Sequence, residues 1–154
     1  MSETRLQHAD LPYSLSFKLS DFDLDKVHHW LSVEAYWSRG LPRDIMERSF
    51  ENSIVLGLYH NDAGQVGLAR MITDKATFAY LGDVFIAENH RGHGLANWLM
   101  ETIMAHHDLQ GLRRMMLATA DMHALYRKFG FKDVRDSKRL MEIVDLDIYV
   151  GSKA

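Results

Sequence analysis

Cysteine is absent from this chain of 154 residues, and proline occurs at only two positions. Without cysteine no disulfide framework can form, which is typical of proteins in a reducing compartment. The same absence removes the side chain best suited to capture an acyl group from a thioester. No internal repeat, low-complexity tract or linker divides the sequence. We therefore expect one domain over residues 1–154, with a flexible segment at residues 1–10.

Long hydrophobic runs and a strong charge imbalance are also missing. No apolar stretch approaches the roughly 20 residues that a membrane-spanning helix requires. Residues 1–10 are polar and lack the apolar core of a secretory signal peptide. The formal charge of -3 gives no basic field that would attract nucleic acid. We therefore expect a cytoplasmic enzyme or binding module with neither a membrane nor a nucleic-acid partner.

Histidine is abundant, with nine residues, but its spacing does not indicate a metal site. The adjacent pairs His28-His29 and His106-His107 would point about 100° apart on a helix. Neither an HExxH motif nor a Cys/His ligand pattern is present. We expect solvated or capping histidines and no bound metal.

Hydrophobic periodicity and turn residues predict an ordered series of strands and helices. Residues 54–86 predict a meander of three antiparallel strands. A later strand follows a helix, so it is expected to run parallel to the last strand of that meander. The order predicts an α+β fold with a mixed, mostly antiparallel sheet and helices on its faces. The expected strands are 13–19, 54–60, 65–73, 77–86, 114–119 and 140–148, and the expected helices begin after Ser20 or Asp21, at Leu41, at Leu95 and at Met122.

The most informative segment is 83–96, which reads as a strand, a basic glycine turn and the start of an amphipathic helix. The first N–H groups of a helix lack partners and the helix dipole is positive there, so such a turn attracts phosphate. The dinucleotide-binding fingerprint fits poorly, because Asn97 occupies its third glycine position and the preceding strand belongs to a meander. The alternative is a turn that binds no ligand.

A second motif, at residues 124–131, follows one further helix and one further strand. Together, Arg91-x-x-Gly94-x-Ala96 and the later Leu-Tyr-x-x-x-Gly-Phe segment resemble the GNAT acyltransferase superfamily. The expected element order fits this family from Tyr13 onward. The resemblance implies acetyl-CoA as the cofactor, bound in a cleft where two parallel strands, at 84–86 and 117–119, splay apart.

The resemblance also implies which residues hold the cofactor. Backbone groups of the strand would pair with the pantetheine amides as a neighbouring strand does, and a strand bulge would free them. Glycines of the turn would let the backbone approach the pyrophosphate, and Arg91 would add positive charge, whereas the His93 side chain is given no chemistry. Asp121 is expected to cap a short helix near the cofactor. The implied cofactor-binding residues are Val84, Phe85, Ile86, Arg91, Gly92, His93, Gly94, Leu95, Ala96, Asp121 and Tyr126.

The implied reaction is acyl transfer to an amine by direct attack in a ternary complex, because no cysteine is available for a relay. Tyr126 stands at the family's acid position, where a phenol with a pKa of about 10 can protonate the departing thiolate; its alternative role is packing. A backbone N–H at Val84 or Phe85 would stabilise the oxyanion. Where many members carry a glutamate base, this chain has Gly82 followed by Asp83. Asp83 is the candidate base, and a structural carboxylate or a water chain are the alternatives.

The acceptor is less well defined by the sequence. Tyr36 and Trp37 lie in the segment that covers the acceptor pocket in similar proteins, and Arg70 and Asp74 lie near the end of the meander. Aromatic rings and a carboxylate suit a cationic amine, whereas arginine suits a carboxylate-bearing one. We favour a small-molecule primary amine as the substrate, over a non-catalytic acyl-CoA-binding module or acetylation of a protein lysine or N-terminus. A homodimer would also fit, with strand 140–148 as a candidate edge.

Overall fold

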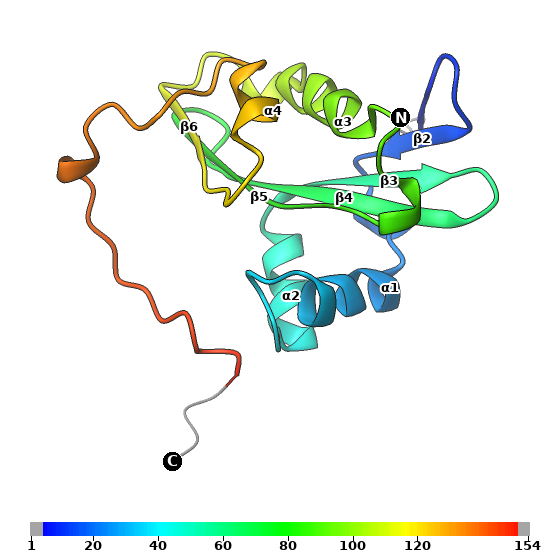
Figure 1. The fold of residues 1–154 in the computed structure, drawn as a ribbon, viewed down its shortest axis with the longest axis horizontal. Coiled ribbons are helices and arrows are strands. Elements are labelled where there is room, and N and C mark those ends of the chain that lie inside the picture. Colours follow the sequence, from blue (N-terminus) through cyan, green and yellow to red (C-terminus); the bar gives the residue numbers. More distant parts are fainter. Residues whose placement is uncertain (1–4, 151–154) are drawn as a thin grey trace.

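In a computed structural model that describes residues 5–150, the chain forms a six-stranded sheet with helices on both faces (Figure 1). The strands lie side by side in chain order, and β5–β6 is the parallel pair among antiparallel neighbours. This arrangement confirms the predicted mixed α+β fold. The strands are β1 (Leu6–Gln7), β2 (Tyr13–Ser16), β3 (Ile54–His60), β4 (Gly64–Thr73), β5 (Phe78–Ile86) and β6 (Arg114–Leu117).

Two helical layers cover the sheet, one on each face (Figure 1). One layer contains α1 (Leu24–His29), the π-helical turn η2 (Trp30–Glu34) and α2 (Arg43–Glu51), and the other contains α3 (Leu95–Met104) and α4 (His123–Arg127). The 3-10 turns are η1 (Leu19–Asp21), η3 (Glu88–His90), η4 (His107–Leu109) and η5 (Ser137–Arg139).

Each layer buries its own apolar core against the sheet, and α3 shows how the sequence achieves this. Its Leu95, Leu99 and Ile103 recur every four residues, so they share one face, and all three are buried against the sheet. The other core includes Val27 and Met46. Because β3 and β4 lie between these cores, they are buried on both faces and read as apolar runs.

Residues 140–148 do not form the predicted strand, so that prediction was wrong. This segment lies outside every regular element, and Met141 and Ile143 are 98% and 106% exposed. An apolar strand is stable only beside a partner, and here the chain leaves the body and runs on alone (Figure 1). The sixth strand is instead β1, which pairs with β2 and comes from the segment expected to be flexible; residues 1–4 lie outside the described part.

The first helix is capped by a residue that the sequence analysis did not select. Asp23, rather than Ser20 or Asp21, is the N-cap of α1, and its side chain accepts a hydrogen bond from the Lys26 N–H at 3.1 Å. Residues 19–21 form the separate turn η1, which delays the start of α1. A side-chain acceptor satisfies one of the free N–H groups of the first turn.

The short helix α4 also starts differently from the prediction. Met122 is its N-cap residue, no side chain caps the helix, and the predicted capping role of Asp121 was wrong. The Met122 N–H donates instead to Thr119 Oγ1 at 3.0 Å. A threonine three residues back therefore replaces the expected aspartate, and Asp121 is exposed in the bend before the helix.

Two irregularities of the sheet occur close together on β5. Across the β4–β5 pair, two residues of β5, Asp83 and Val84, oppose the single residue Ala69, which is a β-bulge. On the other side of β5, the parallel pairing ends at Leu81 and Leu117. Within the described residues, the last part of β5 therefore has no strand beside it on the β6 side.

A glycine substitution tests how closely the bulge is packed against β4. A Cβ at Gly67 would lie 2.7 Å from the backbone oxygen of Phe85, whereas a Cβ at Gly82 would lie 3.8 Å from its nearest atom, in Tyr80. We expect Gly67→Ala to lower the free energy of unfolding by roughly 1–3 kcal/mol, because the backbone must shift. Urea unfolding measures it, and Gly82→Ala should cost less than about 0.5 kcal/mol. Equal effects of the two variants would contradict this packing.

Candidate active site

The glycine turn joins β5 to α3 through two residues in left-handed conformation. Gly92 has φ +84 and Gly94 has φ +74, a region that other residues enter only with strain. Gly94 is the N-cap of α3 and has no side chain to bind the first N–H groups of the helix. A Cβ at either glycine would meet nothing within 4 Å. The turn is thus an open helix N-terminus with unsatisfied donors, which suits a phosphate group.

Arg91 lies at the same turn, but its side chain folds back onto β5. Its Nε donates to the backbone oxygen of Ile86 at 2.7 Å, and its guanidinium lies 5.5 Å from the centre of the Phe85 ring. Within residues 5–150, the two terminal nitrogens make no hydrogen bond, and the residue is exposed. Arg91 can therefore offer positive charge beside the turn while its Nε stays on the strand.

Asp83 brings three of the predicted site residues together at the bulge. Its Oδ2 accepts from Arg70 Nε at 2.7 Å, and its Oδ1 accepts from the indole N–H of Trp37 at 3.0 Å. Side chains of Arg70 and Asp83 are only 18% and 11% exposed. Ser53 Oγ lies 3.3 Å from another nitrogen of Arg70. A charged, mostly buried pair therefore links β4, β5 and the segment that follows η2.

The backbone of Asp83 is itself unusual. Its φ of +53 places a residue with a side chain in the left-handed region, inside a strand. Aspartate and asparagine tolerate this conformation better than other side chains do. Local strain of this kind is characteristic of functional sites and persists only where the surroundings enforce it. The bulge and the ion pair with Arg70 provide that enforcement.

Tyr126 of α4 is buried, at 8% exposure, and its ring lies edge-on to Phe131 at 5.9 Å. Burial raises the pKa of its phenol above the ordinary value, and the nearby phenol of Tyr36 raises it further. Tyr36 in turn packs edge-on against Trp37 at 5.1 Å. The two exposed aromatic residues thus connect Tyr126 with the carboxylate of Asp83.

The hydroxyl of Tyr126 is free to donate. Among residues 5–150, it makes no hydrogen bond. Together with the raised pKa, this leaves a protonated phenol available at neutral pH. The arrangement is suited to general-acid chemistry.

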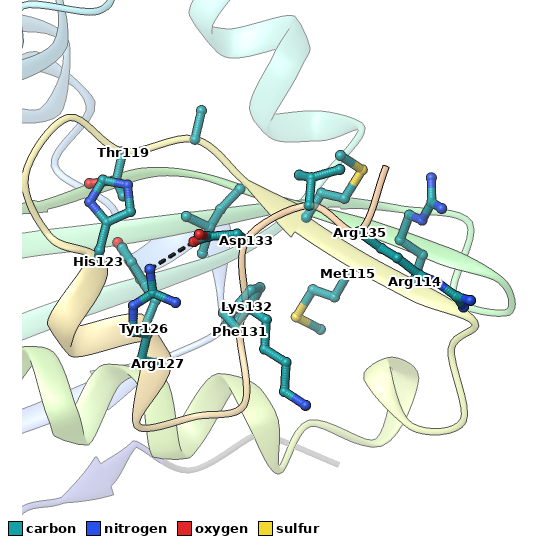
Figure 2. Close-up of a pocket in the computed structure, with 14 residues that line it drawn as sticks. Arg114, Met115, Thr119, His123, Tyr126, Arg127, Phe131, Lys132, Asp133 and Arg135 are labelled. Carbon is teal, nitrogen blue, oxygen red and sulfur yellow. Dashed lines mark hydrogen bonds and ion pairs between the residues drawn. The ribbon is translucent and has the colours of Figure 1, made fainter. Parts of the chain in front are cut away.

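Tyr126 also lines a pocket of about 470 Å³ on the other edge of the site (Figure 2). β6 and the residues just after it form one wall, α4 contributes His123 and Arg127, and residues 131–135 form the opposite wall. Figure 2 shows the ion pair between Arg127 and Asp133, 2.7 Å apart, that joins α4 to this wall. The pocket is therefore bounded by a strand edge on one side and by an extended segment on the other.

Asp74 is placed apart from this group, in the turn between β4 and β5. Its carboxylate accepts from the backbone N–H groups of Ala76, Thr77 and Phe78, and from the Thr77 hydroxyl. These bonds, the Thr77 hydroxyl first, hold the pKa of Asp74 well below its usual range. The geometry favours a structural role in the turn over the acceptor contact expected from the sequence.

One turn of the described chain gathers metal-ligand types. Ligand atoms of His106, His107 and Asp108 lie within 4.8 Å of one another. These residues are consecutive, and the His106 ring already accepts from the Asp108 N–H at 3.1 Å. This bond explains the clustering as helix-turn capping.

No helix among residues 5–150 combines the length and apolar character of a membrane span.

The open end of β5 beside a glycine-rich helix N-terminus defines the acyltransferase fold whose motifs the sequence resembles. The family described as acetyltransferase (GNAT) matches residues 24–131. A curated relative from Gibberella zeae, described as an acetyltransferase, is 36% identical over 146 residues, which cover 80% of this chain and 81% of the relative. This chain belongs to the GNAT acetyltransferase family.

Solved structures support the same assignment. A crystal structure from Xanthomonas campestris, described as an acetyltransferase of the GNAT family, is 40% identical, with a TM-score of 0.88, and covers 95% of this chain and 99% of its own. An acetyltransferase with acetyl-CoA from Clostridium acetobutylicum is 12% identical, with a TM-score of 0.60, over 86% of this chain and 94% of its own. At that identity, the second likeness concerns the fold alone.

Asp83, Arg70 and Trp37, three of the residues predicted from the sequence, meet in the structure, whereas Asp74 lies apart from them. Two contacts that order this region were not predicted. Ser53 holds Arg70, and Thr119 replaces Asp121 at the start of α4. The Ser53 contact had no local signal, because strand register brings the partners together, whereas Thr119 lies three residues before Met122 and was a local capping candidate that was not considered. The Gly82-Asp83 pair was a usable signal for the bulge, since both types are uncommon inside strands.

Variants of Asp83 separate its charge from its backbone conformation. Asn tolerates the left-handed backbone but cannot neutralise Arg70, so Asp83→Asn should lower the free energy of unfolding by about 1–3 kcal/mol. Asp83→Val also forces a β-branched residue to positive φ, which should cost roughly 1–3 kcal/mol more. Chemical denaturation of both variants measures the difference. A valine variant as stable as the asparagine variant would show that the left-handed backbone is not retained.

Proposed function

We propose that this protein transfers an acetyl group from acetyl-CoA to the primary amine of a small molecule, by direct attack in a ternary complex. The observation that carries the proposal is the position of the bulge. Asp83 and Val84 lie where the β5–β6 pairing has ended, and after the strand the chain passes through the turn η3 to the open N-terminus of α3. One strand thus connects a strained carboxylate, free backbone groups and an anion-binding turn.

The residues at the turn fit the phosphates of coenzyme A. Gly92 and Gly94 leave open space where side chains would project, and the first turn of α3 offers free N–H groups. The N–H groups of 95–96 and the terminal nitrogens of Arg91 would hold the diphosphate. Backbone groups of 84–86 would pair with the amides of the pantetheine arm, because that edge of β5 has no neighbouring strand among the described residues. When bound, the cofactor supplies an activated acetyl group as a thioester.

Tyr126 would act as the acid. Its buried phenol stays protonated at neutral pH, because its pKa is raised, and its hydroxyl has no competing partner among residues 5–150. A proton given by Tyr126 would neutralise the thiolate that leaves when the amide bond forms. Backbone N–H groups at Val84 or Phe85 would stabilise negative charge on the acyl oxygen.

Asp83 would bind the acceptor amine and take its proton, directly or through water. Each oxygen of the Asp83 carboxylate accepts one hydrogen bond, Oδ2 from Arg70 and Oδ1 from Trp37. An ionised carboxylate can accept about four hydrogen bonds in all. Positions therefore remain for an ammonium group. Because Arg70 is paired with Asp83, its charge is not available to a carboxylate on the acceptor.

The exposed rings of Tyr36 and Trp37 favour a cationic acceptor. They are 61% and 44% exposed and stand next to the Asp83 carboxylate, to which Trp37 donates. Aromatic faces attract ammonium groups, and the carboxylate adds charge of the right sign. A primary amine with an apolar or aromatic body therefore suits this surface better than a zwitterion.

Replacing the acid gives the most direct test of turnover. In an assay of free coenzyme A release over a panel of primary amines, Tyr126→Phe should lower kcat by about 100-fold with little change in cofactor affinity. Tyr59→Phe is the matched control, because Tyr59 is also buried and its hydroxyl also lacks a partner among the described residues, but it lies on β3 rather than on α4. The kcat of the wild type should decrease at alkaline pH, as the pH rises through the raised pKa of Tyr126, above about 10. This alkaline decrease should be missing from Tyr126→Phe.

Equal turnover by wild type and Tyr126→Phe would remove this residue from the mechanism. Binding of coenzyme A without turnover on any amine would favour a non-catalytic acyl-CoA-binding module. Asp83→Asn should lower kcat/KM for the amine at a temperature where the variant is folded, whereas a purely structural carboxylate would leave kcat/KM unchanged.

Alanine variants of two glycines with similar positive φ angles test the phosphate turn. Coenzyme A at 100 times its Kd should stabilise the wild type by about 2.7 kcal/mol in thermal unfolding. Gly94→Ala should lose most of this stabilisation, because a methyl group would enter the space for the diphosphate. Gly111→Ala is the control, since Gly111 has φ +69 and open space but lies outside the turn. Loss of binding in both variants, or in neither, would contradict the assignment.

A further inference from the structure

Three rings from distant parts of the chain meet beside the phosphate turn, residues 91–94. Tyr13 of β2, His60 at the end of β3 and His90 of η3 lie with their ring centres 5.0, 5.3 and 5.7 Å apart. We call these three residues the ring cluster. His90 is the last residue of η3 and directly precedes the phosphate turn. The ring cluster therefore connects the sheet with the site proposed for the diphosphate.

A short hydrogen bond attaches His90 to the sheet. It joins the hydroxyl of Tyr13 to Nδ1 of His90 at 2.7 Å. A neutral imidazole accepts this bond at its unprotonated nitrogen, whereas a protonated imidazole donates it, and a tyrosine hydroxyl can take either role. The bond is therefore compatible with both protonation states. His90 can gain or lose a proton without releasing η3 from β2.

The charged groups that face His90 are cations. Burial of the half-buried imidazole and the positive charge of three neighbours lower the pKa of His90 below the ordinary histidine value. Among the described residues, no carboxylate forms an ion pair with His60 or His90. His90 is therefore neutral in the free protein at neutral pH. Apart from the Tyr13 phenol of β2, the titratable groups that face it are His60 at the end of β3, His93 of the phosphate turn and Lys26 of α1.

A charge at the phosphate turn reaches the imidazole of His90. His93 lies in the turn between Gly92 and Gly94, and its positive charge is one of the causes that disfavour the protonated form of His90. A diphosphate at the same turn carries the opposite charge, so it would favour the protonated form. The turn therefore provides electrostatic coupling between a bound anion and a nearby proton site.

We propose that binding of coenzyme A at the phosphate turn is coupled to the uptake of a proton by His90, so that the affinity for the cofactor increases as the pH falls from about 8 to about 6. An imidazole is neutral at high pH and charged at low pH, and the bound anion stabilises the charged form, which gives the coupling this sign. His90 acts through the turn and not on the reacting atoms, so it is a positioning residue. The proposal rests on the proposed function, because it takes the turn as the diphosphate site.

The hydrogen bonds of the ring cluster favour a proton over a metal ion. Nδ1 of His60 accepts the backbone N–H groups of Asp62 and Ala63, at 3.1 and 3.2 Å. In a neutral imidazole the proton then lies on Nε2, which leaves no lone pair there for a metal. Nδ1 of His90 is occupied as well, by the hydroxyl of Tyr13. The cluster is therefore suited to proton binding.

Calorimetric titration of the full chain with coenzyme A tests the coupling without an acceptor amine. Titrations at several pH values, in buffers with different ionisation enthalpies, give the dissociation constant and the number of protons taken up. His90→Gln is the test variant, because an amide can still form a hydrogen bond with Tyr13 but does not titrate. His107→Gln is the matched control, because His107 lies in η4, beyond the C-terminal end of α3.

The wild type should show the coupling and His90→Gln should lack it. From about pH 8 to about pH 6, the dissociation constant of the wild type should fall by about 3-fold more than that of His90→Gln, which corresponds to a rise of about 1 in the pKa of His90 on binding. His107→Gln should behave as the wild type does. The 3′-phosphate of coenzyme A itself titrates near pH 6, but this contribution is the same for every variant and cancels in the comparison.

The outcomes separate this coupling from the proposed function. Equal proton uptake by the wild type and His90→Gln would overturn the coupling and leave the phosphate site intact, whereas no binding of coenzyme A at any pH would overturn both. If His90→Gln does not fold, the wild type is titrated with dephospho-coenzyme A, whose diphosphate does not titrate between about pH 6 and pH 8. Proton uptake on binding of this probe supports the coupling, and binding without proton uptake would overturn it.

Discussion

The ion pair between Arg70 and Asp83 is the constraint on which the site depends. It joins β4 to β5 across the bulge, at a distance of 2.7 Å, and both side chains are largely shielded from water. A buried guanidinium without its carboxylate is strongly unfavourable, so the pair fixes the strained backbone of Asp83. The bulge follows the point at which the pairing of β5 with β6 ends. The indole of Trp37 binds the same carboxylate and so attaches the aromatic segment to it.

The two ends of the site use different physical means to bind opposite charges. At the α3 end, backbone N–H groups and the helix dipole favour anions, and glycines at positive φ leave the approach open. At the bulge end, a carboxylate and exposed aromatic rings favour a cation. Tyr126 lies near the second end, where burial keeps its phenol protonated. This separation of charge along one strand suits a reaction between a phosphate-bearing donor and an amine.

The same strand arrangement explains the unsatisfied features at the C-terminus. β6 is short, ends where the site begins, and has one open edge within the described residues. Residues 140–148 are exposed and largely apolar, and most of the charged side chains that line the pocket along this edge are cations. Tyr126 also lines this pocket, so the open edge of β6 lies next to the site.

The sequence by itself determined three elements. Apolar strand patterns predict the meander 54–86, glycines predict the turn after it, and apolar spacing predicts α3; the structure confirms all three. Tertiary structure decided the rest. The Arg70–Asp83 pair joins residues that meet only through strand register. Residues 140–148 have a strand pattern but no strand within one chain, because a strand pattern states which side chains need burial and not which surface will bury them.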